Sequence, residues 1–168
     1  NDIQKQIEAH SDINKDRGDA FEVFAEAYLT LGINAPYEKV LPENKITKKH
    51  FDRLQITSSD TNVRGIDGVL ATSTEEFHTY QVKYRSHGEK LSWNDLTGSV
   101  AASIHADALL IFTNAIDLDD DISQRNVYSI KYDKLNELKA DDFKRIEELI
   151  YKGKKKKKGF FSKVFGSK

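Results

Sequence analysis

The sequence contains no cysteine and no methionine, and only two prolines and one tryptophan among its 168 residues. The absence of cysteine excludes disulfide bonds and thiolate metal sites, and it fits a cytoplasmic protein in a reducing environment. No apolar run approaches the length of a membrane-spanning helix, so none is predicted. Because methionine is missing even at position 1, we expect a processed chain or a piece of a larger protein.

The charge is unevenly distributed along the chain. The formal net charge is −1, but residues 152–168 hold eight lysines and no acidic residue. Residues 1–151 carry 18 basic and 27 acidic side chains, a net charge of −9. Such an acidic body is not typical of a protein that binds nucleic acid tightly and without specificity. We expect one domain over 1–151 and a lysine-rich tail or linker over 152–168.

Apolar spacing predicts an alternation of helices and strands. Phe21, Phe24, Tyr28 and Leu31 recur every three or four residues, which indicates an amphipathic helix over 17–31. We expect further elements at 1–13 (a frayed helix), 65–71 and 76–85 (strands), 92–104 (helix), 108–112 and 126–131 (strands) and 141–151 (helix), with a connection at 36–42, an ambiguous segment at 45–54 and a turn at 58–62. This order predicts an α/β domain with a mixed sheet between helices.

Three polar residues on neighbouring strands suggest a chemical site. Asp67 lies between Gly65 and Gly68, and Gln81 and Lys83 follow on the next strand. Because side chains alternate along a strand, Gln81 and Lys83 share one face, whereas their neighbours Tyr80, Val82 and Tyr84 point into the core. A carboxylate, an amide oxygen and an ammonium group on one patch can hold a hard metal ion and polarise a water molecule. This combination suggests phosphodiester chemistry.

Each residue has an expected role at such a site. Asp67 anchors the metal, Gln81 and the backbone carbonyl of Val82 add neutral oxygen ligands, and Lys83 orients water or offsets negative charge. Glu22 lies at the border of the buried face of the first helix and can lean towards the metal. Glu26, one turn later, is expected to be solvated instead.

Three motifs together resemble the PD-(D/E)xK nuclease superfamily, and most closely its Mrr-type restriction endonucleases. These motifs are Gly18–Glu22, Gly65–Gly68 and Gln81–Lys83, and the resemblance covers roughly residues 15–115. It implies a restriction-endonuclease-like three-layer fold and Mg²⁺-dependent DNA cleavage, with Mn²⁺ as a substitute. By this resemblance Glu22 is the helix acid, Asp67 the metal ligand, Gln81 the variant acid and Lys83 the catalytic lysine.

The chain departs from the superfamily pattern at two positions. Arg64, Gly65 and Ile66 precede Asp67 where a proline is usual, and Gln81 replaces an acid, which removes one negative charge. Two hypotheses follow. The first is a restriction or defence endonuclease that acts as a homodimer with a helicase, ATPase or sensor domain. The second is a catalytically decayed nucleic-acid-binding module of the same fold.

Basic residues outside these motifs are candidates for contacts with DNA phosphates. Arg85 extends the face of Gln81 and Lys83, although a surface salt bridge explains it equally well. The other candidates are the consecutive lysines Lys154, Lys155, Lys156, Lys157 and Lys158. Lysines followed by an apolar stripe also fit an anionic membrane surface, but we prefer a linker and expect no membrane partner.

Overall fold

Five strands form one mixed sheet in the computed structural model, which describes residues 17–34, 37–56, 65–86, 88–122 and 126–165, with the backbone alone at 121 and 154–165. The strands are β1 (Tyr37–Pro42), β2 (Gly68–Thr72), β3 (Phe77–Lys83), β5 (Ala108–Thr113) and β7 (Val127–Ile130), in the spatial order β1-β2-β3-β5-β7. Pairing is antiparallel from β1 to β3 and parallel from β3 to β7. Short strands β4 (Lys90–Leu91) and β6 (Asp117–Leu118) pair separately.

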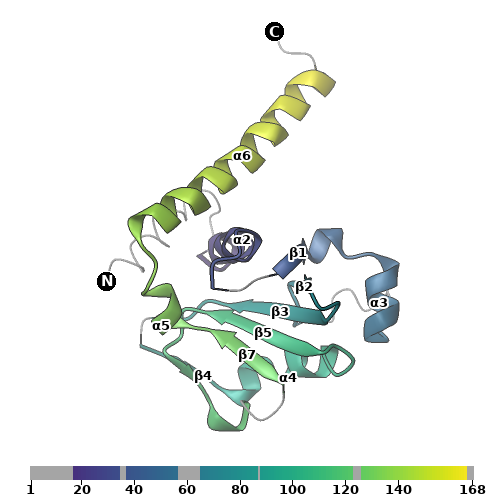
Figure 1. Ribbon diagram of the computed structural model, residues 1–168, viewed down its shortest axis with the longest axis vertical. Helices are drawn as coiled ribbons and strands as arrows, with labels where there is room; N and C mark the ends of the chain where they lie inside the picture. The colour runs from purple at the N-terminus through teal and green to yellow at the C-terminus, as the bar shows by residue number, and fades with distance from the viewer. Residues whose placement is uncertain (1–16, 35–36, 57–64, 87, 123–125, 166–168) are drawn as a thin grey trace.

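Helices cover both faces of the sheet (Figure 1). The helical segments are α2 (Arg17–Thr30), η2 (Glu43–Lys45), α3 (Lys48–Leu54), α4 (Trp93–Ala102), η4 (Asp120–Ile122), α5 (Tyr132–Leu135) and α6 (Ala140–Phe165). Helices α2 and α6 lie over one face of the sheet and α4 lies under the other. This three-layer α/β arrangement confirms the predicted restriction-endonuclease-like architecture.

The apolar stripe of α2 anchors the main core. Phe21, Phe24 and Tyr28 are fully or almost fully buried, and all three rings pack against Phe112 of β5 at centroid distances of 5.3, 6.2 and 5.1 Å. The helix ends at Thr30, one residue before the predicted boundary, and Gly32 just beyond it adopts a φ of 68°. Burial of this stripe therefore fixes α2 against the sheet, with its acidic edge alongside β3.

The predicted order of strand, helix and strand over 76–112 is also confirmed, and it forms a β3–α4–β5 crossover between parallel strands. Ser92 caps α4 in a reciprocal capping box with Asp95. Every residue of β5 is buried, as expected for a strand that is covered on both faces. On the α4 side of the sheet, the hydroxyls of Thr79 and Ser103 lie 2.6 Å apart and join β3 to the residue that follows the helix.

Several expected boundaries differ from the structure. The expectation of a connection at 36–42 is wrong, because β1 pairs with β2 there; this edge strand is irregular between Tyr37 and Lys39 and exposes polar residues, which hides its periodicity. The ambiguous segment contains α3. Helix α6 continues past Tyr151 to Phe165, so the expected domain boundary at 151/152 falls inside a helix. The predictions for 1–13 and 58–62 lie outside the described residues.

Within the described segments, no helix combines the length and the apolar character that crossing a bilayer requires.

Candidate functional site

Asp67 occupies the point where β2 and β3 separate. Strand β2 begins one residue later, at Gly68, so Asp67 lies just before the strand and not on it as expected. The backbone N–H of Asp67 donates to the Tyr80 carbonyl at 2.8 Å. Its carboxylate Oδ2 accepts a hydrogen bond of 2.6 Å from the backbone N–H of Val82. The Val82 N–H lies past the point where the pairing of β2 with β3 begins, so the Asp67 carboxylate takes the place of a strand partner for it. This bond fixes the position of the carboxylate.

The environment of Asp67 is unfavourable for a negative charge. Burial raises the pKa of the Asp67 carboxyl, and the nearby Glu43 carboxylate raises it further. The hydrogen bond from Val82 and the Lys83 ammonium act in the opposite direction. Burial also raises the pKa of the Tyr80 phenol, with smaller contributions from the negative charges of Glu26, Asp67 and Glu22. Negative charges therefore concentrate around Asp67 in a partly dehydrated place.

Gln81 is buried and only partly satisfied. Its side chain is 7% exposed, and its Nε2 donates to the Val82 carbonyl at 3.1 Å. Because a carbonyl can only accept, the amide must direct its NH₂ group there, which leaves Oε1 as a buried acceptor with no hydrogen-bond partner. An orphaned oxygen of this kind is uncommon in a folded domain and can serve as a ligand for a cation.

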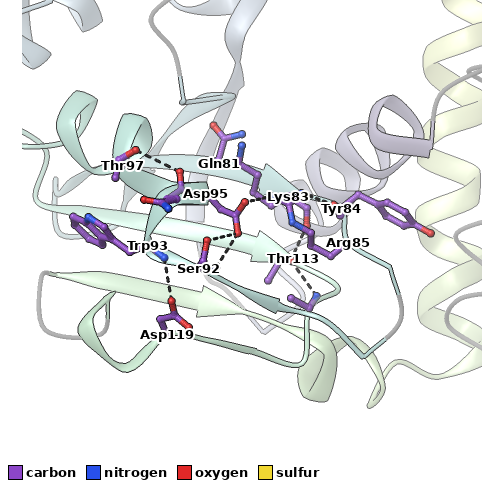
Figure 2. A network of polar contacts seen from close by, with 12 residues as sticks. Gln81, Lys83, Tyr84, Arg85, Ser92, Trp93, Asp95, Thr97, Thr113 and Asp119 are labelled. Carbon is purple, nitrogen blue, oxygen red and sulfur yellow. Dashed lines mark hydrogen bonds and ion pairs between the residues drawn. The ribbon is translucent and has the colours of Figure 1, made fainter.

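Lys83 extends from the same side of β3 as Gln81, as the alternation predicted (Figure 2). It lies close enough to Asp67 to lower the pKa of that carboxyl. The opposite face of β3 carries Tyr80 and Val82, which are buried in the main core, and Tyr84 packs against them. The predicted division of β3 into a polar and an apolar face is therefore confirmed.

A cleft of about 650 Å³ lies between α2, the segment after β1 and the start of β2. We call it the acidic cleft; its lining residues are Asp19, Glu22, Val23, Glu26, Pro42, Glu43, Asn44, Ile46, Phe51, Asp67, Tyr80 and Val82. Five of these residues are acidic, and none of the described lining residues is lysine or arginine. The cleft therefore repels anions and attracts cations.

The structure brings Glu22 and Asp67 together with Val82 at the acidic cleft, whereas Gln81 and Lys83 are not among its lining residues. Within the described residues, no three histidine or acidic side chains are close enough to share a metal ion. A metal at this site would therefore need the amide or backbone oxygens of β3, or water, in addition to the carboxylates.

Sequence reasoning missed part of the acidic cleft. Asp19, Glu43 and Asn44 line it but were not proposed as site residues, and Glu26 lines it although it was expected to be solvated. Glu26 is half-buried. Its position one helical turn after Glu22 was the available signal. No signal marked Glu43, because the strand that places it was not predicted.

Two glycines allow the close packing around Asp67. Gly65 has a φ of 112°, and a Cβ there would lie 2.5 Å from the backbone nitrogen of Ser99 in α4. A Cβ on Gly68 would lie 2.4 Å from the Leu41 carbonyl oxygen and 2.4 Å from the Tyr80 ring. Side chains at these positions would push α4 or β1 away from the site.

Arg85 belongs to a network that joins the ends of β3 and β5 to the start of α4 (Figure 2). Its guanidinium pairs with Asp95 at 2.7 Å and donates to the Tyr84 carbonyl at 2.8 Å. The backbone of Arg85 exchanges two hydrogen bonds of 2.7 Å with the side chain of Asn114. These contacts favour the salt-bridge interpretation of Arg85 over phosphate binding. The side chains of 154–158 lie outside the described residues, so their predicted role stays a prediction.

Comparisons with known proteins support the fold. No family model matches the chain, and no curated protein matches it in sequence. A solved structure described as "ATP-dependent Type ISP restriction-modification enzyme LlaBIII bound to DNA" is similar, with a TM-score of 0.55 and 16% sequence identity. The match covers 83% of this chain but only 9% of that chain. At this identity the likeness concerns the fold, which this chain shares with a small part of a restriction-modification enzyme.

Proposed function

We propose that this chain is the nuclease domain of a DNA endonuclease that hydrolyses phosphodiester bonds with Mg²⁺, in restriction, defence or another form of DNA processing. The observation that carries the proposal is the position of Asp67. Its half-buried carboxylate is fixed by the Val82 N–H, lines the acidic cleft with Glu22, and lies within electrostatic reach of Lys83. Carboxylates that are destabilised in this way cluster at functional sites.

The proposed donor atoms are all oxygens, which hard cations prefer, although Gln81 is not among the residues that line the acidic cleft. Asp67 and Glu22 supply carboxylate oxygens, and Gln81 Oε1 is a buried acceptor without a partner. The Val82 carbonyl accepts a hydrogen bond from Gln81, and a carbonyl oxygen has a second lone pair that can form a ligand bond. We therefore propose Asp67, Glu22, Gln81 and Val82 as the residues that hold Mg²⁺, with Mn²⁺ as a substitute. Bound Mg²⁺ would supply an acidified water molecule and neutralise charge on the phosphate.

The residues of the chain have separate tasks in this proposal. Burial raises the pKa of Asp67, and the Val82 N–H and Lys83 oppose this shift by favouring the carboxylate form that the proposed chemistry needs. The Lys83 ammonium can donate a hydrogen bond to a phosphate oxygen or to the attacking water, which favours the more negative transition state. Glu22, which is exposed at the mouth of the cleft, can accept a proton from water.

The proposed partners follow from the description of the structurally similar restriction-modification enzyme. That enzyme is described as ATP-dependent and bound to DNA, and this chain corresponds to 9% of its length. We propose DNA as the substrate and an ATPase, helicase or sensor domain, on the same chain or a partner, as the unit that controls cleavage. Because two strands must be cut, we propose that two copies of the domain act together.

Nicking of supercoiled plasmid in Mg²⁺ tests the proposal. Wild type should nick the plasmid, EDTA should stop the reaction, and Asp67→Ala and Lys83→Ala should each lower the rate by about a hundredfold or more. Asp133→Ala and Lys90→Ala remove the same charges from exposed positions of the described surface and should leave the rate unchanged. Equal rates for wild type and both site variants would rule out the proposal.

A decayed nucleic-acid-binding module is the second candidate. It is favoured by Gln81 in the position of an acid and by the lack, among the described residues, of three acidic or histidine side chains close enough to share a metal. Calorimetric titration with Mn²⁺ separates the two candidates. A nuclease should bind Mn²⁺ in a way that Asp67→Ala abolishes, whereas a decayed module should bind DNA but show no metal binding that depends on Asp67.

A further inference from the structure

Basic side chains flank one wall of the acidic cleft, although none of them lines it. Residues 43–51 form one wall, which includes Phe51. The same segment carries Lys45, Lys48 and Lys49, whose side chains are exposed and are not among the residues that line the cleft. These three lysines therefore form a basic rim along one side of an acidic opening. We call them the lysine rim.

Helix α3 carries two of the three rim lysines, Lys48 and Lys49, and Lys45 lies at the end of η2 just before it. Leu54 is buried, whereas the Lys48 side chain is 84% exposed and pairs with the exposed Asp52 at 3.1 Å. The helix begins with a capping box in which the Thr47 backbone N–H donates to His50 Nδ1 at 3.0 Å. The His50 ring stacks on Phe77 of β3 at 6.1 Å. One face of α3 is thus fastened to the sheet, whereas Lys48 and Lys49 of the same helix are exposed.

Positive charge accumulates around α3 although the domain as a whole is acidic. Burial lowers the pKa of His50, and the charges of Lys49 and Lys39 lower it further. The guanidinium of Arg53 lies 4.8 Å above the Phe77 ring and pairs with Asp107 at 3.4 Å. A local cluster of cations in a domain with a net charge of −9 is an electrostatic footprint for an anionic partner.

The opposite wall cannot bind such a partner. Helix α2 contributes Asp19, Glu22 and Glu26 to the acidic cleft, and these carboxylates repel phosphates. A polyanion that brings one phosphate to Asp67 is therefore repelled less on the side of the lysine rim. Helix α3 stands at that side, at the end of the molecule opposite α5 (Figure 1).

We propose that the lysine rim binds the phosphate backbone of duplex DNA and so delivers a phosphodiester to Asp67. This inference rests on the proposed nuclease function and adds the surface that holds the substrate. Lysines act as point charges on phosphates, so the rim positions the duplex without reading its sequence. Any sequence preference must come from another part of the protein.

Fluorescence anisotropy with a short labelled duplex in EDTA measures this contact without cleavage. The full chain carrying Lys45→Gln, Lys48→Gln and Lys49→Gln should bind more weakly than wild type. Its slope of log affinity against log salt should fall by about two to three, because each lost phosphate contact on duplex DNA removes about 0.9. The matched control, Lys134→Gln, Lys139→Gln and Lys144→Gln, loses the same charge from exposed positions of the α5–α6 region and should keep the wild-type slope.

The outcomes separate this inference from the proposed function. If wild type nicks the plasmid and both triple variants show equal salt slopes, the proposal that the lysine rim binds DNA is wrong, whereas the proposed nuclease function stands. A reduced slope for the rim variant without any nicking by wild type would support the rim and contradict the nuclease. A wild-type chain that binds no duplex, or a rim variant that loses affinity for anionic vesicles but not for DNA, would overturn the rim.

Discussion

The carboxylate of Asp67 accepts a hydrogen bond of 2.6 Å from the backbone N–H of Val82. This bond links Asp67, the residue just before β2, to β3, the strand that carries Gln81 and Lys83. It holds a half-buried carboxylate whose pKa is raised, mainly by burial. Ionisation of this carboxyl therefore costs stability, at the position where the proposed chemistry needs a negative charge.

Replacing Asp67 by asparagine should stabilise the protein. Asparagine keeps an oxygen that can accept from the Val82 N–H but carries no buried charge. We expect the free energy of unfolding at neutral pH to rise by about 0.5–2 kcal/mol, the range common for stabilising substitutions. Urea unfolding followed by circular dichroism measures this change.

The pH dependence of that difference follows from the raised pKa of Asp67. A carboxyl with a folded-state pKa above its unfolded value favours folding when it is protonated, and this contribution is lost as pH rises through the folded pKa. The advantage of Asp67→Asn should therefore be small in acid, below the usual pKa of aspartate, and should grow towards neutral pH. An advantage that shrinks as pH rises would contradict the assigned environment.

Gly68→Ala should destabilise the junction of β1, β2 and β3. The new methyl group would meet the Leu41 carbonyl and the Tyr80 ring at 2.4 Å, and neither can move without shifting the sheet. We expect a loss of about 1–3 kcal/mol in thermal or urea unfolding, which is typical of overpacking. Gly153→Ala is the matched control, because nothing lies within 4 Å of its added Cβ and alanine favours a helix.

Gln81→Glu tests the orphaned oxygen of Gln81. A second carboxylate at this buried position should lower stability without metal, because burial disfavours the charged form. In Mg²⁺ the same charge should strengthen metal binding by about tenfold or more, since affinity for hard cations follows the charge of the ligands. Gln81→Met, which has a similar volume and no oxygen, should bind metal more weakly than wild type. Titration of all three proteins with Mn²⁺ compares them, and identical affinities would exclude Gln81 from the site.

Asp95 should contribute more to stability than Arg85, its partner. Asp95 accepts from the Ser92 backbone N–H at 2.8 Å and pairs with Arg85 at 2.7 Å, so Asp95→Ala removes both a helix cap and an ion pair. We expect a loss of about 1–2 kcal/mol, in the range of lost caps. Arg85→Ala leaves the cap intact and should cost less. Urea unfolding of both variants gives the comparison, and a larger loss for Arg85→Ala would show that the cap is not the main contribution.

The elements with strong local periodicity were predictable from the sequence. The apolar stripe of α2 predicts a helix, and the continuous apolar run of β5 predicts a strand. The apolar residues of both elements are buried in the core, as these patterns indicate. Strand β1 was not predictable, because it lies at the edge of the sheet and its exposed Glu38 and Lys39 resemble a loop. The end of α6 was missed because the change in composition after Tyr151 does not interrupt the helix.

The candidate site was predictable only in part, for a related reason. Alternation along β3 was sufficient to place Gln81 and Lys83 on one face. The bond from Val82 to Asp67 depends on where β2 stops, and the contribution of Glu43 depends on a strand that was not recognised. Local patterns therefore identified the residues of β3, whereas the shape and charge of the acidic cleft required the three-dimensional arrangement.

The most direct test of the account is the rate at which Asp67→Asn nicks supercoiled plasmid in Mg²⁺, measured beside its unfolding in urea. The account predicts that this variant is more stable than wild type yet nicks at least about a hundredfold more slowly, because the carboxylate that costs stability is the one that supports hydrolysis. A variant that nicks the plasmid at the wild-type rate would contradict the central claim.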